Sequence, residues 1–195
     1  MSADKTRIFS FFKVSRFRFW MGLIILFPVL LIFVAFQTNF YSAYVIISGS
    51  MLPTLQIGDC VIVRTDTGEI PSRGTIFAFH NPLQPDEVLV KRVIGIPGDE
   101  IVVRQGYLYV NNNMENAEHA SPLLMKRSEF ITRVGEEEVF VLGDNRNNSF
   151  DSLDFGMVHR NYFVGTVFFI YWPPRHIRFI KRDYDIFSDS AELEQ

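Results

Sequence analysis

An uninterrupted apolar run near the amino terminus constrains the fold of this chain more than any other feature. Residues Phe19–Phe36 read FWMGLIILFPVLLIFVAF, 18 residues without a charged side chain. As a helix, a run of this length is about 27 Å long, close to the thickness of the hydrocarbon core of a bilayer. The run therefore predicts a retained transmembrane anchor that crosses the membrane once. Pro28 can kink such a helix, but membrane helices tolerate proline well.

The charges beside this run predict its orientation. Residues 1–18 carry five lysines and arginines against the single acid Asp4, and no charged residue occurs from Phe19 to Gly58. Because basic segments stay on the cytoplasmic side, residues 1–18 are expected to be a cytoplasmic leader, with everything after about Gln37 on the other side. A cleaved signal peptide or a buried core helix would also be apolar. The run is longer than a usual signal-peptide core, however, and no convincing cleavage site follows it.

The few cysteines and histidines exclude several kinds of site. Cys60 is the only cysteine, so the chain cannot form an intrachain disulfide or a multi-cysteine zinc site. The four histidines are scattered and show no metal-binding spacing. We therefore expect no metal ion and no cofactor. The formal net charge of −3 disfavours a nucleic-acid-binding protein.

Short runs of β-branched and aromatic residues, separated by Gly, Pro and Asn, follow the anchor. This spacing predicts a mostly β fold: an antiparallel β-sheet domain over residues 37–180, joined to one amino-terminal transmembrane helix at 19–36. The polar composition of residues 111–133 predicts a long excursion, and the acidic composition of residues 181–195 predicts a weakly structured tail. The expected strands are Cys60–Arg64, Thr75–Phe79, Val88–Val93, Glu100–Val103, Tyr107–Val110, Glu138–Leu142 and Gly165–Tyr171.

A turn-forming segment, Ser48–Leu55, follows the apolar run. Ser50 is preceded by Gly49 and closely followed by Pro53, which is typical of a constrained turn that can expose a serine hydroxyl. Neighbouring N–H groups and the hydroxyl of Ser48 could then point at one oxyanion. The same residues could also form only a turn that connects the anchor to the first strand.

A lysine lies within the predicted strand Val88–Val93. In an extended strand, Lys91 shares a face with the apolar Leu89 and Val93. Partial burial among apolar side chains lowers the pKa of a lysine, and its neutral amine can then act as a general base. A snorkelling lysine or an edge-strand lysine would show the same pattern. The following residues, Ile96–Asp99, fit a type II turn and predict that the strand enters a tight hairpin.

A polar cluster, Gly143–Ser152, follows the predicted strand Glu138–Leu142. It reads GDNRNNSFDS, and side chains of this kind can stabilise a turn by binding its own backbone. A calcium loop of the EF-hand type is the competing interpretation. It fails because Arg146 occupies a ligand position and no glutamate falls at the last one.

These three segments occur in this order behind an amino-terminal anchor, and together they resemble the type I signal peptidase family. Members of that family are membrane-bound serine proteases that remove signal peptides from exported proteins. The resemblance covers most of residues 37–172 and implies an endopeptidase that cleaves after small-x-small sequences. The matching stretches are SGSMLPTL at 48–55, KRVIGIPGD at 91–99, GDNRNNSFDS at 143–152 and, more weakly, RGTIFAF at 73–79.

The resemblance implies a role for each matching residue. Ser50 corresponds to the nucleophile and Lys91 to the general base, so that an amine replaces the imidazole of a Ser-His-Asp triad. The N–H of Ser50 and the hydroxyl of Ser48 correspond to the oxyanion hole, and Ser149 to the serine that orients the lysine. The charged positions that correspond to supporting residues are Arg92, Asp144, Arg146 and Asp151. The candidates for substrate binding are Tyr44, Ile46, Met51, Leu55 and Val90.

Two residues depart from the family's pattern. Thr75 stands where many members have an aspartate. Leu153 stands where many members have an arginine that pairs with the aspartate two residues earlier. Neither residue corresponds to the nucleophile or the base, so activity is still expected. The departure at Leu153 leaves the supporting role of Asp151 open.

The anchor and the resemblance together imply where the protein acts. The expected partners are the lipid bilayer and the signal peptides of pre-proteins that emerge from the export machinery, with no nucleic acid. The expected location is the plasma (inner) membrane of a bacterium, with the amino terminus cytoplasmic and the catalytic domain outside. A thylakoid or other organellar membrane would fit the same sequence.

Three other functions compete with this one. A processing peptidase dedicated to a pilin or conjugation system would carry the same dyad. A self-cleaving Ser-Lys protease of the repressor type would need a DNA-binding head and a cytoplasmic site, which the anchor disfavours. A membrane-tethered β domain could also bind a partner without catalysis.

Overall fold

The computed structural model of the chain describes residues 20–34, 40–65, 68–115 and 129–181. The chain divides into two compact units, Met1–Tyr41 and Ser42–Gln195. In the first unit, residues 20–34 form a helix whose side chains are all exposed. No helix within the described ranges is both long and apolar enough to cross a membrane. The predicted leader, the ends of the predicted span and nearly all of the predicted acidic tail lie outside the described residues.

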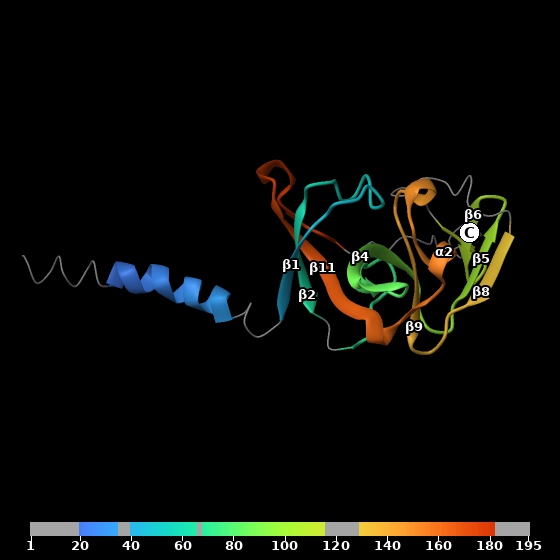
Figure 1. Ribbon diagram of the computed structural model, residues 1–195, viewed down its shortest axis with the longest axis horizontal. Coiled ribbons are helices and arrows are strands. Elements are labelled where there is room, and N and C mark those ends of the chain that lie inside the picture. Colours follow the sequence, from blue (N-terminus) through green and yellow to red (C-terminus); the bar gives the residue numbers. More distant parts are fainter. Residues whose placement is uncertain (1–19, 35–39, 66–67, 116–128, 182–195) are drawn as a thin grey trace, which may run out of the picture. The chain divides into compact units, whose positions relative to one another are not determined.

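An eight-stranded sheet forms the body of the second unit (Figure 1). Its strand order is β1-β2-β11-β3-β4-β9-β10, with β12 paired to β11. The pairs β2–β11, β11–β3, β3–β4, β4–β9 and β9–β10 are all antiparallel. The strands are β1 (Tyr41–Val45), β2 (Cys60–Thr65), β3 (Ile76–Asn81), β4 (Gln84–Gly95), β9 (Glu138–Leu142), β10 (Val158–His159), β11 (Phe163–Trp172) and β12 (Arg178–Phe179).

A second, four-stranded antiparallel sheet has the order β7-β6-β5-β8. Its strands are β5 (Glu100–Arg104), β6 (Tyr107–Val110), β7 (Asn113–Met114) and β8 (Glu129–Arg133). Two-residue turns with positive φ at both positions join its hairpins, with φ of 52° and 81° at Gln105-Gly106 and 53° and 68° at Asn111-Asn112. Such turns match the twist of paired strands. All seven predicted strands are therefore confirmed, as is the mostly β, antiparallel class.

The predicted excursion at residues 111–133 is partly structured at both ends. β7 follows directly after the turn at its start, and β8 occupies its last five residues. β8 has an alternating burial pattern, but the sequence does not show it, because the apolar Ile131 is exposed and the polar Thr132 is half-buried. Residues 116–128 of the excursion lie outside the described residues.

The predicted tight hairpin after Lys91 is wrong, although the turn itself is present. The N–H of Asp99 donates to the carbonyl of Ile96 at 3.0 Å, and Gly98 has φ +87°. However, β4 pairs with β3 and β9, whereas β5 pairs with β6 and β8. The turn therefore carries the chain from the large sheet to the small one. The physical reason is burial, because Ile94 before the turn and Ile101 after it both pack into one cluster between the sheets.

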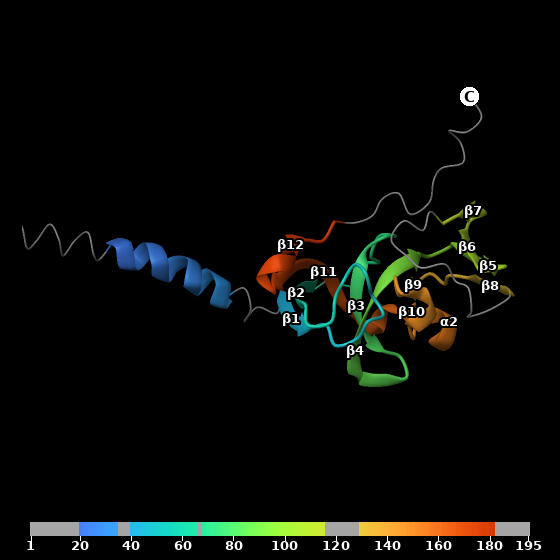
Figure 2. The same cartoon turned by 90° about the horizontal axis from the view of Figure 1, so that it is seen from above.

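Three clusters of apolar side chains form the core. One contains Ile94, Ile101, Phe140 and Leu153 and joins the small sheet to β9. The second contains Met51, Leu55 and Val61 beside β11, and the third centres on Phe77, Phe79 and Val141. In both Figure 1 and Figure 2 the small sheet lies at one end of this unit, beyond β9 and the helix α2 (Ser152–Phe155), and β2 lies toward the other.

The helices of the second unit are short. α2 (Ser152–Phe155) begins with a capping box, in which the Asp151 side chain caps the helix and the Asp154 side chain binds back to the N–H of Asp151. The other helices in the described part of this unit are single 3₁₀ turns, η1 (Arg146–Asn148), η2 (Arg160–Tyr162) and η3 (Pro174–His176).

Candidate active site

The predicted serine turn is a closed loop between β1 and β2. At its base, the N–H of Ile46 donates to the carbonyl of Asp59, and the N–H of Gly58 donates to the carbonyl of Ile46, both at 2.8 Å. At its tip, the N–H of Leu52 donates to the carbonyl of Gly49 at 3.2 Å. These bonds hold Ser50 within a constrained turn, where it is 7% exposed.

Lys91 contacts Ser50 directly. Its Nζ donates to Ser50 Oγ at 2.7 Å, and the two residues are 41 positions apart in the sequence. Lys91 is 3% exposed and lies on β4, which is paired on both sides, to β3 and to β9. It is therefore neither an edge-strand lysine nor a snorkelling one. A buried amine within hydrogen-bonding distance of a hydroxyl has the geometry of a general base and its nucleophile.

A second hydroxyl lies beside this pair. Ser48 is exposed, and its Oγ is 3.2 Å from Ser50 Oγ. The hydroxyl of Ser48 and the N–H of Ser50 therefore lie on the same turn. Both can donate to a negatively charged oxygen that forms beside Ser50 Oγ.

A groove of about 460 Å³ runs from the Ser50–Lys91 pair between β1 and the first half of β4. Four of the predicted substrate-binding residues, Tyr44, Ile46, Met51 and Val90, line it. Leu55 does not, which corrects that prediction. Leu55 is fully buried in the core cluster under the turn, because the turn folds its apolar side chain inward. The carboxylates of Asp86 and Glu87 lie at the groove as well.

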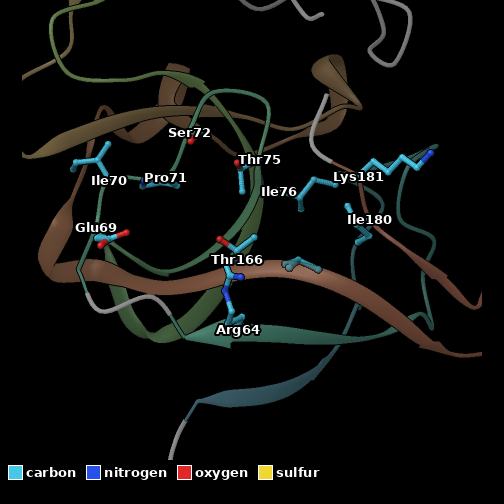
Figure 3. Close-up of a pocket in the computed structure, with 11 residues that line it drawn as sticks. Arg64, Glu69, Ile70, Pro71, Ser72, Thr75, Ile76, Thr166, Ile180 and Lys181 are labelled. Carbon is cyan, nitrogen blue, oxygen red and sulfur yellow. The ribbon is translucent and has the colours of Figure 1, made fainter. Parts of the chain in front are cut away.

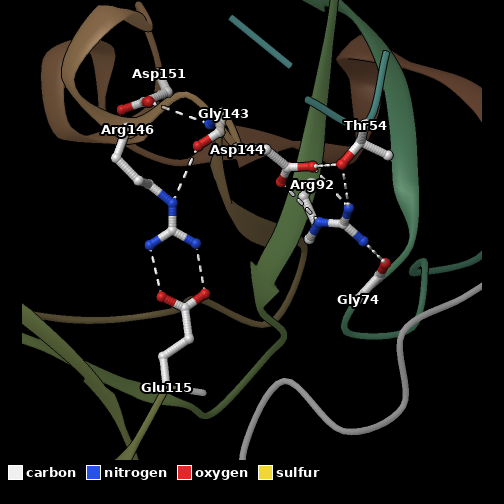
Figure 4. Close-up of polar contacts among 8 residues, drawn as sticks. All are labelled: Thr54, Gly74, Arg92, Glu115, Gly143, Asp144, Arg146 and Asp151. Atoms are coloured by element: carbon white, nitrogen blue, oxygen red, sulfur yellow. Dashed lines mark hydrogen bonds and ion pairs between the residues drawn. The ribbon is translucent and has the colours of Figure 1, made fainter. Parts of the chain in front are cut away.

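The buried pair Arg92–Asp144 joins four segments, namely β4, the polar cluster after β9, the residues before β3 and the serine turn (Figure 4). Arg92 donates from Nε and Nη2 to the two oxygens of Asp144 at 2.8 and 2.7 Å, and from Nη1 to the carbonyl of Gly74 at 3.0 Å. The hydroxyl of Thr54 donates to Asp144 as well. The network thus ties β4 to the polar cluster after β9 and to the end of the serine turn.

Arg146 and Asp151 hold the same polar cluster from two sides (Figure 4). Arg146 donates from Nε to the carbonyl of Gly143 at 3.0 Å, and Asp151 accepts the N–H of Gly143 at 3.2 Å. Arg146 also forms a bidentate ion pair with Glu115. Sequence reasoning missed Glu115, because it lies in the predicted polar excursion and no motif marks it.

Asn145 is a second residue that sequence reasoning missed. Its N–H donates to the carbonyl of Ser50, and its side chain Nδ2 donates to the carbonyl of Gly49, both at 3.0 Å. The predicted cluster therefore binds the backbone of the serine turn as well as its own. The only signal in the sequence that could have identified Asn145 as a site residue is its place in the triplet Gly143-Asp144-Asn145.

Ser149 lies at the contact between these segments. It is 8% exposed, and a Cβ placed on Gly143 would be 2.3 Å from its Oγ and 2.5 Å from the carbonyl oxygen of Ser50. Only glycine fits at position 143. The hydrogen bond from Ser149 to the lysine remains a prediction.

The two departures from the family's pattern lie away from the groove. Thr75 lines a different pocket of about 210 Å³, which shares no lining residue with the groove and faces Arg64 and Thr166 (Figure 3). Leu153 is 3% exposed and belongs to the apolar cluster at the small sheet. Asp151 keeps its place without an arginine at 153, because it caps α2 and accepts the N–H of Gly143. Within the described ranges, no group of three or more His, Cys, Asp or Glu side chains is placed to hold a metal ion.

Comparison with known proteins shows which family this sequence is similar to. A family profile described as signal peptidase, peptidase S26, matches residues 19–172. A probable signal peptidase I-2 from Synechocystis sp. is 35% identical over 170 residues, which cover 83% of this chain and 73% of that protein. Signal peptidase I from Bacillus caldolyticus is 39% identical over 155 residues, 71% of this chain and 84% of that protein. A crystal structure of a signal peptidase I from Enterococcus faecalis overlaps 50% of this chain and 97% of that chain at 31% identity, with a TM-score of 0.42.

Proposed function

The chain belongs to the signal peptidase family, peptidase S26, and from this we propose that it removes signal peptides from exported pre-proteins with Ser50 as nucleophile and Lys91 as general base. The chain is thus a serine endopeptidase. The observation that supports the assignment most directly is the 2.7 Å contact between Lys91 Nζ and Ser50 Oγ. Both residues are buried and line the groove between β1 and β4.

The proposed reaction follows from this contact. The neutral amine of Lys91 takes the proton of the Ser50 hydroxyl as Oγ attacks the scissile carbonyl. The N–H of Ser50 and the hydroxyl of Ser48 stabilise the oxyanion that forms. The ammonium of Lys91 then returns its proton to the leaving amine, and the C–N bond breaks to give an acyl-enzyme. A water, deprotonated by Lys91, hydrolyses the ester and releases the signal peptide.

The supporting residues hold these groups in place. Ser149 is proposed to orient Lys91, while Arg92, Asp144, Arg146 and Asp151 hold the cluster that packs against the serine turn. Such fixed geometry matters because a loosely held nucleophile and base lose rate steeply. In the groove, Tyr44, Ile46, Met51 and Val90 are proposed to contact the substrate residues before the cut.

Cleavage of a model pre-protein with an Ala-x-Ala site tests the function. The purified chain should release one signal peptide, and the amino-terminal sequence of the product should begin directly after the site. A processing peptidase dedicated to a pilin or conjugation system would cleave only its own substrate in a panel of pre-proteins. A noncatalytic binding domain would cleave none, and a serine-acylating inhibitor would not label Ser50.

The rate of cleavage is expected to rise with pH. Burial disfavours the charged form of an amine, and only the neutral amine of Lys91 can accept the serine proton. The kcat/KM for a model pre-protein should therefore increase from about pH 6 and level off once the lysine is neutral. A profile that falls steadily between about pH 6 and pH 9 would count against Lys91 as the base.

The apolar run is proposed to anchor the protein in a bacterial plasma membrane, with the amino terminus cytoplasmic. The support is the length of the run in the sequence and the exposure of every side chain in the helix at residues 20–34. Replacing both Leu26 and Leu30 with arginine should release the protein from membranes washed with alkaline carbonate, because a central arginine costs about 2.5 to 3.5 kcal/mol on insertion. A wild-type chain that the same wash extracts would contradict the anchor.

A further inference from the structure

We propose that Glu115 is a positioning residue for the reaction at Ser50, acting through Arg146. The proposal rests on the function proposed above. Glu115 directly follows β7, and its N–H donates to the carbonyl of Leu108 on β6 at 2.8 Å. The backbone of Glu115 is therefore held by the small sheet, while its side chain reaches the polar cluster after β9 (Figure 4).

The ion pair between Glu115 and Arg146 is buried and bidentate. Nη1 and Nη2 of Arg146 contact the two carboxylate oxygens of Glu115 at 2.6 and 2.5 Å. The side chains are 5% and 2% exposed. The third nitrogen of the guanidinium, Nε, donates to the carbonyl of Gly143. Because a bidentate carboxylate fixes the plane of a guanidinium, Glu115 determines the direction from which Arg146 holds Gly143.

Gly143 transmits this constraint to the nucleophile. A Cβ at this position would come within 2.5 Å of the carbonyl oxygen of Ser50, so the two backbones are in close contact. The N–H of Asn145, two residues later, donates to the same carbonyl at 3.0 Å. A displacement of Gly143 must therefore move the backbone that carries Ser50 Oγ, or break its contacts.

Loss of the Glu115 carboxylate would leave Arg146 buried without its counter-charge. A buried charge without a counter-charge is destabilising. The guanidinium of Arg146 is therefore expected to move toward water and to displace Gly143, to which it donates. Asp151 still accepts the N–H of Gly143 from the other side. We therefore expect the cluster to shift but to stay folded. A misplacement of about 1 Å in an active site can lower the rate about 100-fold.

Glu115→Gln in the full chain tests the proposal, because it removes the charge and keeps the shape. The kcat for a model pre-protein is expected to fall about 10- to 100-fold. KM should change less than about twofold, because Glu115 does not line the groove. The rate at which an acylating inhibitor labels Ser50 should fall in parallel with kcat.

Asp99→Asn is the matched control. It breaks another ion pair beside the small sheet, in which the single nitrogen Nη2 of Arg73 contacts the two carboxylate oxygens of Asp99 at 2.8 and 2.7 Å. This variant is expected to lower Tm while kcat stays within about twofold of wild type. The contrast separates positioning of the cluster from general support of the small sheet.

Four outcomes would overturn the proposal. A wild-type chain that cleaves no pre-protein overturns both this role and the proposed function. If the wild type is active, a Glu115→Gln variant with the wild-type kcat would overturn this role and leave the proposed function standing. So would an Asp99→Asn variant that loses as much kcat as Glu115→Gln at an equal loss of Tm. If Glu115→Gln does not fold, the charge-conserving Glu115→Asp decides. It is expected to lose about 3- to 10-fold in kcat at constant KM, and an unchanged kcat overturns the role.

Discussion

Lys91→Met is expected to lower the rate of pre-protein cleavage by about 10⁴-fold or more. Methionine has nearly the length of lysine but no group that can accept the proton of Ser50 Oγ. Ser50→Ala should have an equal effect, and the double variant should be no slower than either single one, because the two residues act as a unit. The measurement is the single-turnover rate on a model pre-protein in detergent.

Two variants at a different pocket serve as controls for the loss of Lys91 and Ser50. Lys181→Met and Ser72→Ala change the same residue types at exposed positions, which line the other pocket and not the groove. Both should retain the wild-type rate. A Lys91→Met chain that is folded and still turns over near the wild-type rate would show that another group removes the proton.

Asp144→Asn is expected to lower the free energy of unfolding by about 3 to 5 kcal/mol. The substitution leaves the guanidinium of Arg92, which is 3% exposed, without its carboxylate. It also weakens the link to Thr54 at the end of the serine turn. For a domain of this size, the change corresponds to a decrease in Tm of about 10 °C or more, measurable by thermal melting.

Glu137→Gln is the control for this loss of stability. It breaks an ion pair with Arg160 at 3.0 Å, whose side chains are 54% and 43% exposed. Exposed pairs contribute about 0 to 1 kcal/mol because water and salt screen them, so Tm should change by only a few degrees at most. Equal decreases in Tm in the two variants would mean that the buried Arg92–Asp144 pair stabilises the fold no more than an exposed ion pair does.

The sequence was most informative where structure depends on neighbouring residues. A short run of aromatic and aliphatic residues between Gly106 and Asn111 predicted the strand at Tyr107–Val110 with its observed bounds, and Pro97-Gly98 predicted the turn that ends at Asp99. The hairpin expected from that turn was wrong, because a turn reverses the chain but does not choose its partner strand. β8 was missed for a related reason, since at the edge of the small sheet the apolar Ile131 is exposed and the polar Thr132 is half-buried.

Some residues of the candidate site were likewise predicted from the sequence, and others were identified only from their contacts in the structure. Ser50 and Lys91 were found through motifs of the family, and the structure brings them into contact. Leu55 belongs to the same motif as Ser50, yet its side chain is buried in the core. Glu115 and Asn145 had no motif that distinguished them from ordinary loop residues, so only their contacts revealed them.

By itself, the sequence determined the apolar run, the succession of strands and the residue types that can support Ser-Lys chemistry. These features follow from the periodicity of side chains and from local backbone preferences. Tertiary structure alone decided that β4 lies between β3 and β9, that Lys91 reaches Ser50 across 41 residues, and that Glu115 reaches Arg146 across 31. The reason is that strand pairing and the burial of charge depend on which distant faces exclude water together, and no local pattern encodes that choice.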